Sequence, residues 1–76
     1  MNTLASAPIG VPVTIHKIKA SDAFIQRLQD MGLTRGAQVT CLFAAPQGNP
    51  RAYAVRGSIV AMRNGDAAKL SVISTF

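Results

Sequence analysis

The sequence has 76 residues, a hydrophobic content of 49% and a formal net charge of +5. So short a chain forms one small domain whose stability depends on a dense core. Its single cysteine, Cys41, excludes an intramolecular disulfide, and no apolar run approaches the ~20 residues that span a bilayer.

The N-terminal part of the chain predicts a lead-in and then a strand. Residues 1–10 lack a clean hydrophobic period, so we expect a loosely ordered lead-in before a domain at residues 11–76. Residues 11–15 alternate apolar and polar side chains, which is typical of a half-buried strand. Pro12 lacks a backbone donor and places this strand at an edge, or marks its start.

A short helix is predicted next. Ser21 is a good N-cap, and residues 23–31 complete the helix. Its apolar stripe, at spacings of four and three residues, consists of Phe24, Leu28 and Met31. At this length the helix needs a packing partner to be stable.

The helix is expected to end at a sharp corner. Gly32 stands where a C′ residue adopts a left-handed conformation, which glycine does without steric penalty. Leu33 follows as the apolar C″ residue that folds back on the last turn. Gly36 closes a second turn before the next strand, so this corner sets that strand's direction.

The rest of the chain predicts four strands, at residues 37–45, 51–56, 58–63 and 70–73. Residues 46–50 are dense in turn formers and indicate a hairpin loop. Gly57 indicates a bulge or bend. Both faces of residues 58–63 are apolar, which favours a central strand.

Two finer features complete the prediction for this part of the chain. Alternation places Val39, Cys41 and Phe43 on one face of their strand. Residues 64–66 indicate a turn, and residues 67–69 a single helical turn. The whole pattern predicts a mainly β protein: a small SH3-like five-stranded barrel with one short α-helix inserted after the first strand.

The chain shows no set of converging catalytic or metal-binding groups. Its only acids are Asp22, Asp30 and Asp66, and the first and last suit a helix start and a turn. His16 and Cys41 alone do not supply the three or four ligands of a stable transition-metal site. We therefore expect no enzyme activity, no catalytic residue and no cofactor, and ligand spacing does not support a site for Fe²⁺.

The basic residues are scattered and aromatic residues are few, which argues against nucleic acid as the partner. Tyr53, beside Arg51 and near Arg56, is the one place that resembles a base-stacking platform. The alternative is that Tyr53 belongs to the barrel with its hydroxyl at the rim.

Four segments together resemble the FeoA family of small bacterial proteins of ferrous iron uptake. Their residues are RLQDMGLTRG at 27–36, APQGNP at 45–50, VRGSIVAMR at 55–63 and DAAKLSV at 66–72. They follow the family's order, with Asn49 where the family usually has Asp. Each segment alone is mostly turn and packing chemistry, but the combination is specific.

This resemblance implies a cytoplasmic SH3-like protein that docks on FeoB, the membrane protein whose GTPase domain drives ferrous iron import, and modulates it. The protein would not span the membrane itself and would be recruited to its inner face by FeoB. The fold is similar to a C-terminal domain of iron-dependent repressors. The alternatives are a metal-binding or metal-responsive module using His16, Cys41 or Asp side chains, and a nucleic-acid-binding barrel.

Docking surfaces often combine an apolar centre with arginines. The helix-end corner offers such a set, so we expect the partner contacts to be Arg27, Leu28, Leu33, Arg35 and Arg56. Leu28 also fits a buried position on helical periodicity.

Overall fold

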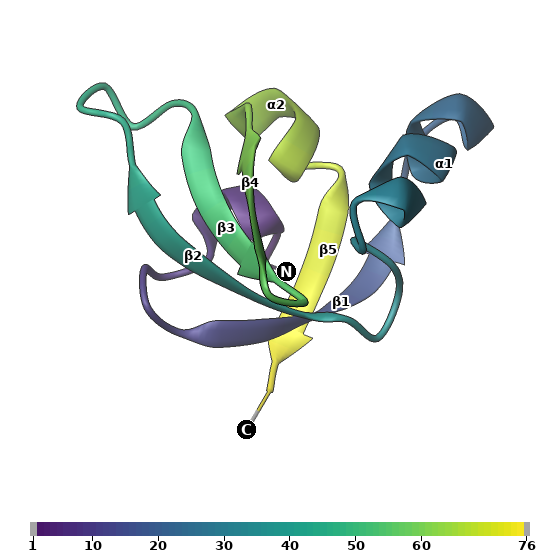
Figure 1. Ribbon diagram of the computed structural model, residues 1–76, viewed down its shortest axis with the longest axis horizontal. Helices are drawn as coiled ribbons and strands as arrows, with labels where there is room; N and C mark the ends of the chain where they lie inside the picture. Colours follow the sequence, from purple (N-terminus) through teal and green to yellow (C-terminus); the bar gives the residue numbers. More distant parts are fainter. Residues whose placement is uncertain (1, 76) are drawn as a thin grey trace.

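The computed structural model describes residues 2–75 (Figure 1). In chain order its elements are a 3-10 turn η1 (Leu4–Ser6), strand β1 (Pro12–Ile18), helix α1 (Asp22–Asp30), strands β2 (Gln38–Ala44), β3 (Arg51–Val55) and β4 (Ser58–Met62), the short helix α2 (Asn64–Ala67) and strand β5 (Leu70–Ser74). Phe76, the end of the expected domain, lies outside the described residues.

The five strands form one antiparallel sheet in the order β4-β3-β2-β1-β5. The predicted mainly β architecture, with a helix inserted after the first strand, is therefore confirmed. The expected closed barrel is not: β4 and β5 are the two edges, and within residues 2–75 they do not pair with each other. The sheet instead curves around its core and stays open (Figure 1).

The prediction that residues 58–63 form a central strand is wrong, because β4 is an edge strand. Its apolar residues do not all enter the core: Met62 is buried, whereas the Ile59 side chain is 69% exposed. Apolar residues on both faces are typical of a central strand, but they do not distinguish it from an edge with an uncovered apolar face.

The N-terminal segment belongs to the core, so the expected loosely ordered lead-in is wrong for residues 2–10. Leu4 and Ala7 are buried in the same cluster as the sheet residues. The segment also pairs with the sheet at two isolated bridges, Thr3 with Ser71 and Ile9 with Cys41. Because Leu4 contributes a fully buried side chain to the core, the N-terminal segment is part of the domain rather than a lead-in before it.

The core side chains come from every part of the sheet and from the corner after α1. The largest that are fully buried are Tyr53, Leu4, Ile15, Leu28, Leu33 and Leu70. Cys41 is buried with them, as alternation predicts. Strand β1 begins at Pro12, which confirms the interpretation of that residue as a strand start.

An irregularity in β2 changes which side chains face the core. The pairing of β2 with β3 shifts register between Cys41 and Phe43, which is the signature of a β-bulge. Phe43 is therefore 59% exposed, and its predicted place beside Val39 and Cys41 is wrong. The extra residue reverses the side-chain alternation that the prediction assumed.

Helix α1 starts close to where the sequence predicts, whereas α2 starts three residues earlier than expected. Ser21 caps α1 as expected, its side chain accepting a hydrogen bond of 3.2 Å from the Phe24 N–H. The predicted helix end at Met31 is the C-cap residue, one position beyond Asp30. The second helical turn begins at Asn64, so it replaces the turn expected at residues 64–66.

Candidate functional site

The corner that follows α1 forms as the sequence predicts. Gly32 has φ +86°, the left-handed conformation expected of a C′ residue. The Leu33 N–H donates to the Leu28 carbonyl over 2.8 Å, and the Gly32 N–H donates to the Gln29 carbonyl over 3.0 Å. These two bonds make a Schellman motif, which satisfies carbonyls that the helix leaves open and holds the corner rigidly.

The β3–β4 turn packs against this corner. Arg56 and Gly57 are the two residues between Val55 and Ser58, which pair with each other, and both have positive φ, 51° and 79°. Positive φ at both central residues defines a type I′ hairpin turn. Gly57 is therefore a turn residue rather than the bulge or bend that the sequence suggested.

The side chain of Arg56 crosses from this turn to the corner. Its Cδ lies 3.1 Å from the position that a β-carbon on Gly32 would occupy. Its guanidinium Nη2 donates to the Thr34 Oγ1 over 3.4 Å. Arg56 nevertheless remains exposed, so the structure places one predicted contact residue directly on the corner with its charge accessible.

Two of the five predicted contact residues are not accessible. Leu28 and Leu33 are both 0% exposed and belong to the core. The C″ leucine of a Schellman motif folds under the last helical turn, and here that contact leads directly into the core. Of the five predicted contact residues, only the arginines therefore remain as candidate contacts on the surface, where the C-cap residue Met31 is also exposed.

Arg27 and Arg35 are exposed but lie differently. The Arg27 guanidinium carbon lies 5.9 Å from the centroid of the Phe24 ring, a cation–π arrangement along α1. Arg35 lines a shallow hollow of about 450 Å³ together with Thr14, His16, Gly36 and Ile73. Of the predicted arginines, the structure shows a contact with the corner only for Arg56.

Sequence reasoning missed a buried arginine. Arg51 is 8% exposed, and its guanidinium donates hydrogen bonds to the carbonyls of Leu4 (3.3 Å), Ala5 and Ala7. These bonds fix the N-terminal segment across the end of β3. Nothing in the local pattern signals this, because the acceptors lie more than forty residues away in the sequence.

Tyr53 supports the same segment from within the core. Its hydroxyl donates to the Leu4 carbonyl over 3.3 Å, and its side chain is 0% exposed. Burial raises the pKa of Tyr53 above its ordinary value, and the nearby Arg51 guanidinium offsets part of that rise. Arg51 and Tyr53 are thus internal, so they do not form the exposed base-stacking platform considered from the sequence.

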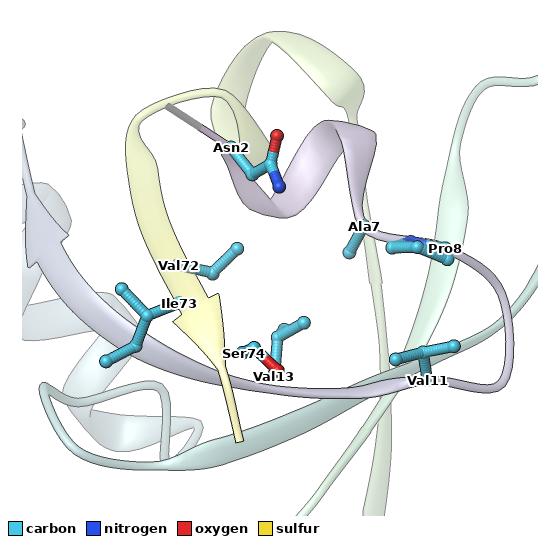
Figure 2. A pocket seen from close by; sticks show the side chains of 8 residues that line it. All are labelled: Asn2, Ala7, Pro8, Val11, Val13, Val72, Ile73 and Ser74. Atoms are coloured by element: carbon cyan, nitrogen blue, oxygen red, sulfur yellow. The ribbon is translucent and has the colours of Figure 1, made fainter. Parts of the chain in front are cut away.

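A second hollow lies beside the N-terminal segment (Figure 2). Its volume is about 200 Å³, and its lining is mostly apolar: Asn2, Ala7, Pro8, Val11, Val13, Val72, Ile73 and Ser74. None of these residues is titratable, so the hollow suits an apolar group rather than acid–base or metal chemistry.

The metal-ligand candidates do not converge. His16 is exposed on β1, whereas Cys41 is buried in the core. Among residues 2–75 there is no group of three or more His, Cys, Asp or Glu side chains placed to hold a metal ion. Over the same residues, no helix combines the length and apolar character needed to cross a membrane.

Comparison with known proteins identifies relatives of the whole chain. The protein-family profile of the FeoA domain matches residues 2–74. The solution structure of FeoA from Chlorobium tepidum is 29% identical, with a TM-score of 0.91 over 99% of this chain and 71% of that one. A search among curated proteins finds no match.

Two further solved structures bear on the fold. The zinc-complexed crystal structure of FeoA from Stenotrophomonas maltophilia, described as an SH3 domain protein and suggested ferrous iron transport activating factor, is 25% identical, with a TM-score of 0.77 over 96% of this chain and 91% of that one. A manganese-dependent transcriptional repressor has 18% identity and a TM-score of 0.81, covering 96% of this chain and 41% of that one. Its likeness shows a shared fold, and the SH3-like assignment rests on the Stenotrophomonas maltophilia structure.

Proposed function

Because the chain belongs to the FeoA family, which is associated with ferrous iron transport, we propose that it is an accessory protein of bacterial ferrous iron uptake. In this proposal it works without catalytic chemistry of its own. It docks on the cytoplasmic part of a FeoB-type membrane GTPase transporter and modulates import. It acts in the cytoplasm and reaches the inner membrane face through that partner.

The observation that carries the proposal is the rigid corner with an exposed arginine fixed on it. The Schellman motif and the packing of Arg56 over Gly32 hold the backbone in one conformation, so little conformational entropy is lost on docking. The planar guanidinium donates in pairs to a carboxylate, which gives directional recognition of an acidic surface. Arg27 and Arg35 extend the same positive charge along the chain on both sides of the corner.

The test measures binding of the purified chain to the cytoplasmic part of the FeoB-type transporter from the same genome. Arg35→Glu is expected to weaken binding by about tenfold or more, with an unchanged melting curve, because an exposed charge is reversed without disturbing the core. Lys19→Glu makes the same charge change before the start of α1 and serves as the control. Equal binding by wild type and by both Arg35→Glu and Arg56→Glu would place the docking face elsewhere.

The alternative of a metal-carrying module is tested separately. The zinc in the Stenotrophomonas maltophilia structure belongs to that protein, and in this chain His16 is the accessible candidate ligand. Calorimetric titration with ferrous iron and with zinc decides between the two functions. Binding tighter than micromolar that is lost in His16→Ala or Cys41→Ser would favour the metal-carrying function.

A further inference from the structure

Strand β4 leaves one edge of the sheet open. It is the last strand in the order β4-β3-β2-β1-β5, and within residues 2–75 its only partner strand is β3. Ser58, Ile59 and Ala61 are all exposed. A sheet edge in this state presents unpaired backbone donors and acceptors to any extended chain that approaches it.

The register shows which backbone groups point outward. The type I′ turn closes on the pair Val55–Ser58, and hydrogen-bonded pairs then alternate along the hairpin. Tyr53–Val60 is the next bonded pair, so Ile59 and Ala61 direct their N–H and C=O groups away from β3. These four groups are spaced as an antiparallel or parallel partner strand requires.

The other edge of the sheet is covered, which makes the β4 edge distinctive. Strand β5 receives the N-terminal segment along its outer side: the Val72 N–H donates to the Asn2 carbonyl over 3.0 Å, and Thr3 bridges to Ser71. Edges left open are usually guarded by a lysine, a proline, a bulge or an inward charge. The sequence of β4, SIVAM, contains no lysine, no proline and no charged residue. Its pairing with β3 has no register shift, so the strand has no bulge there.

Charge at the ends of β4 indicates what kind of segment would fit. Exposed arginines stand just outside both ends of the strand, Arg56 in the turn before it and Arg63 directly after it. The hairpin over residues 51–63 contains no acid. In the described part of the chain the one ion pair joins Lys69 to Asp66, so neither arginine has a carboxylate partner there.

The same charges disfavour a second copy of the chain on this edge. Antiparallel pairing of two β4 strands about a twofold axis would bring Arg56 of each copy toward Arg63 of the other. Like charges placed opposite each other weaken a sheet pairing, whereas carboxylates at those places strengthen it.

We propose that the β4 edge binds an extended segment of a partner protein as a sixth strand of the sheet, with β-branched residues in its middle and aspartate or glutamate at both ends. Ile59 offers an apolar contact on the outer face for alternate side chains of that segment. The inference rests on the β3–β4 hairpin alone and does not depend on the proposed transporter.

The test is a titration of the ¹⁵N-labelled full chain with a short synthetic peptide of alternating valine and threonine, with two aspartates at each end. The amide signals of Ile59 and Ala61 are expected to shift, and their hydrogen exchange to slow by about tenfold. The same peptide N-methylated at alternate amides is expected not to bind, because it cannot complete the ladder. Equal binding by the methylated peptide, or shifts confined to other elements, would overturn the proposal.

Variants of the chain separate backbone pairing from charge. Ala61→Pro removes an outward N–H at an edge position that tolerates proline, and binding is expected to be lost. Arg63→Glu is expected to weaken binding by about tenfold, whereas Arg27→Glu, the same charge change on α1, leaves it within about twofold. Equal weakening by both would indicate only general charge attraction. A dimer in sedimentation that Ala61→Pro abolishes, with no peptide binding, would assign the edge to a second copy and refute the proposal.

Discussion

The Arg56 side chain lies over Gly32: a β-carbon on Gly32 would stand 3.1 Å from Arg56 Cδ. The end of a helix and the tip of a hairpin, far apart in sequence, thus lie so close that a larger residue at position 32 would require the Arg56 side chain to shift. The corner owes its shape both to local backbone geometry and to this tertiary contact.

We predict that Gly32→Val lowers the melting temperature by at least about 5 °C in thermal denaturation followed by circular dichroism. A β-branched residue at φ +86° is strained and also displaces Arg56. Gly65→Ala is the control, because Gly65 lies in α2 with ordinary φ and open space around it. An unchanged melting temperature for Gly32→Val would contradict the left-handed assignment.

We predict that Arg51→Met lowers the free energy of unfolding by about 3 kcal/mol, because buried carbonyls of the N-terminal segment lose charged donors. Urea denaturation measures this change, and amide exchange of Ser6 and Ala7 should accelerate with it. The exposed counterpart Arg63→Met is expected to stay within about 0.5 kcal/mol of wild type. Similar losses in both variants would mean that Arg51 does not hold the segment.

Leu33→Ser is predicted to destabilise the fold by about 3 kcal/mol or more, since it leaves a cavity and buries a hydroxyl. The sequence alone predicted Leu33 as a partner contact, and an accessible contact residue could be replaced with an unchanged melting curve. Denaturant unfolding distinguishes the two outcomes. A wild-type midpoint would show that Leu33 is accessible after all.

The raised pKa of Tyr53 predicts a loss of stability in alkali. The folded state retains the phenolic proton to a higher pH than the unfolded state does, so it binds more protons in that interval. The contribution to stability is complete below the unfolded pKa of about 10 and declines as pH rises from there through the folded pKa. Tyr53→Phe should remove this part of the alkaline decline.

Absorbance titration gives a direct check, because Tyr53 is the only tyrosine in the chain. Its ionisation in the folded protein should be displaced to higher pH than in the denatured protein. Coincident titration curves would contradict a buried hydroxyl bonded to the Leu4 carbonyl.

Features fixed by neighbours in sequence were predictable. The cap at Ser21, the left-handed Gly32 and the turn formers after β2 each follow from local backbone chemistry, and the structure has all three. Which side chains face the core was also predictable from alternation within β2, except where the bulge before Phe43 reversed it.

Features fixed by partners distant in the sequence were not predictable. Whether Arg51 is exposed depends on carbonyls of Leu4, Ala5 and Ala7, and no local period encodes that contact. The position of β4 at an edge depends on the order of the strands in the sheet. The apolar pattern of β4 itself does not indicate that order. The same holds for the candidate docking residues. The local turn does not determine whether Leu33 lies on the surface of the corner or beneath it, because its burial depends on packing against the core.

The sheet joins the two ends of the chain. Val13 pairs with Ser74, and the Val72 N–H bonds to the Asn2 carbonyl. These contacts form only when segments about sixty to seventy residues apart have met, and the loop between them loses its entropy before they form. A topology of this kind gives a high contact order, which places folding in the millisecond-to-second range typical of small β proteins rather than the microseconds of a helical bundle.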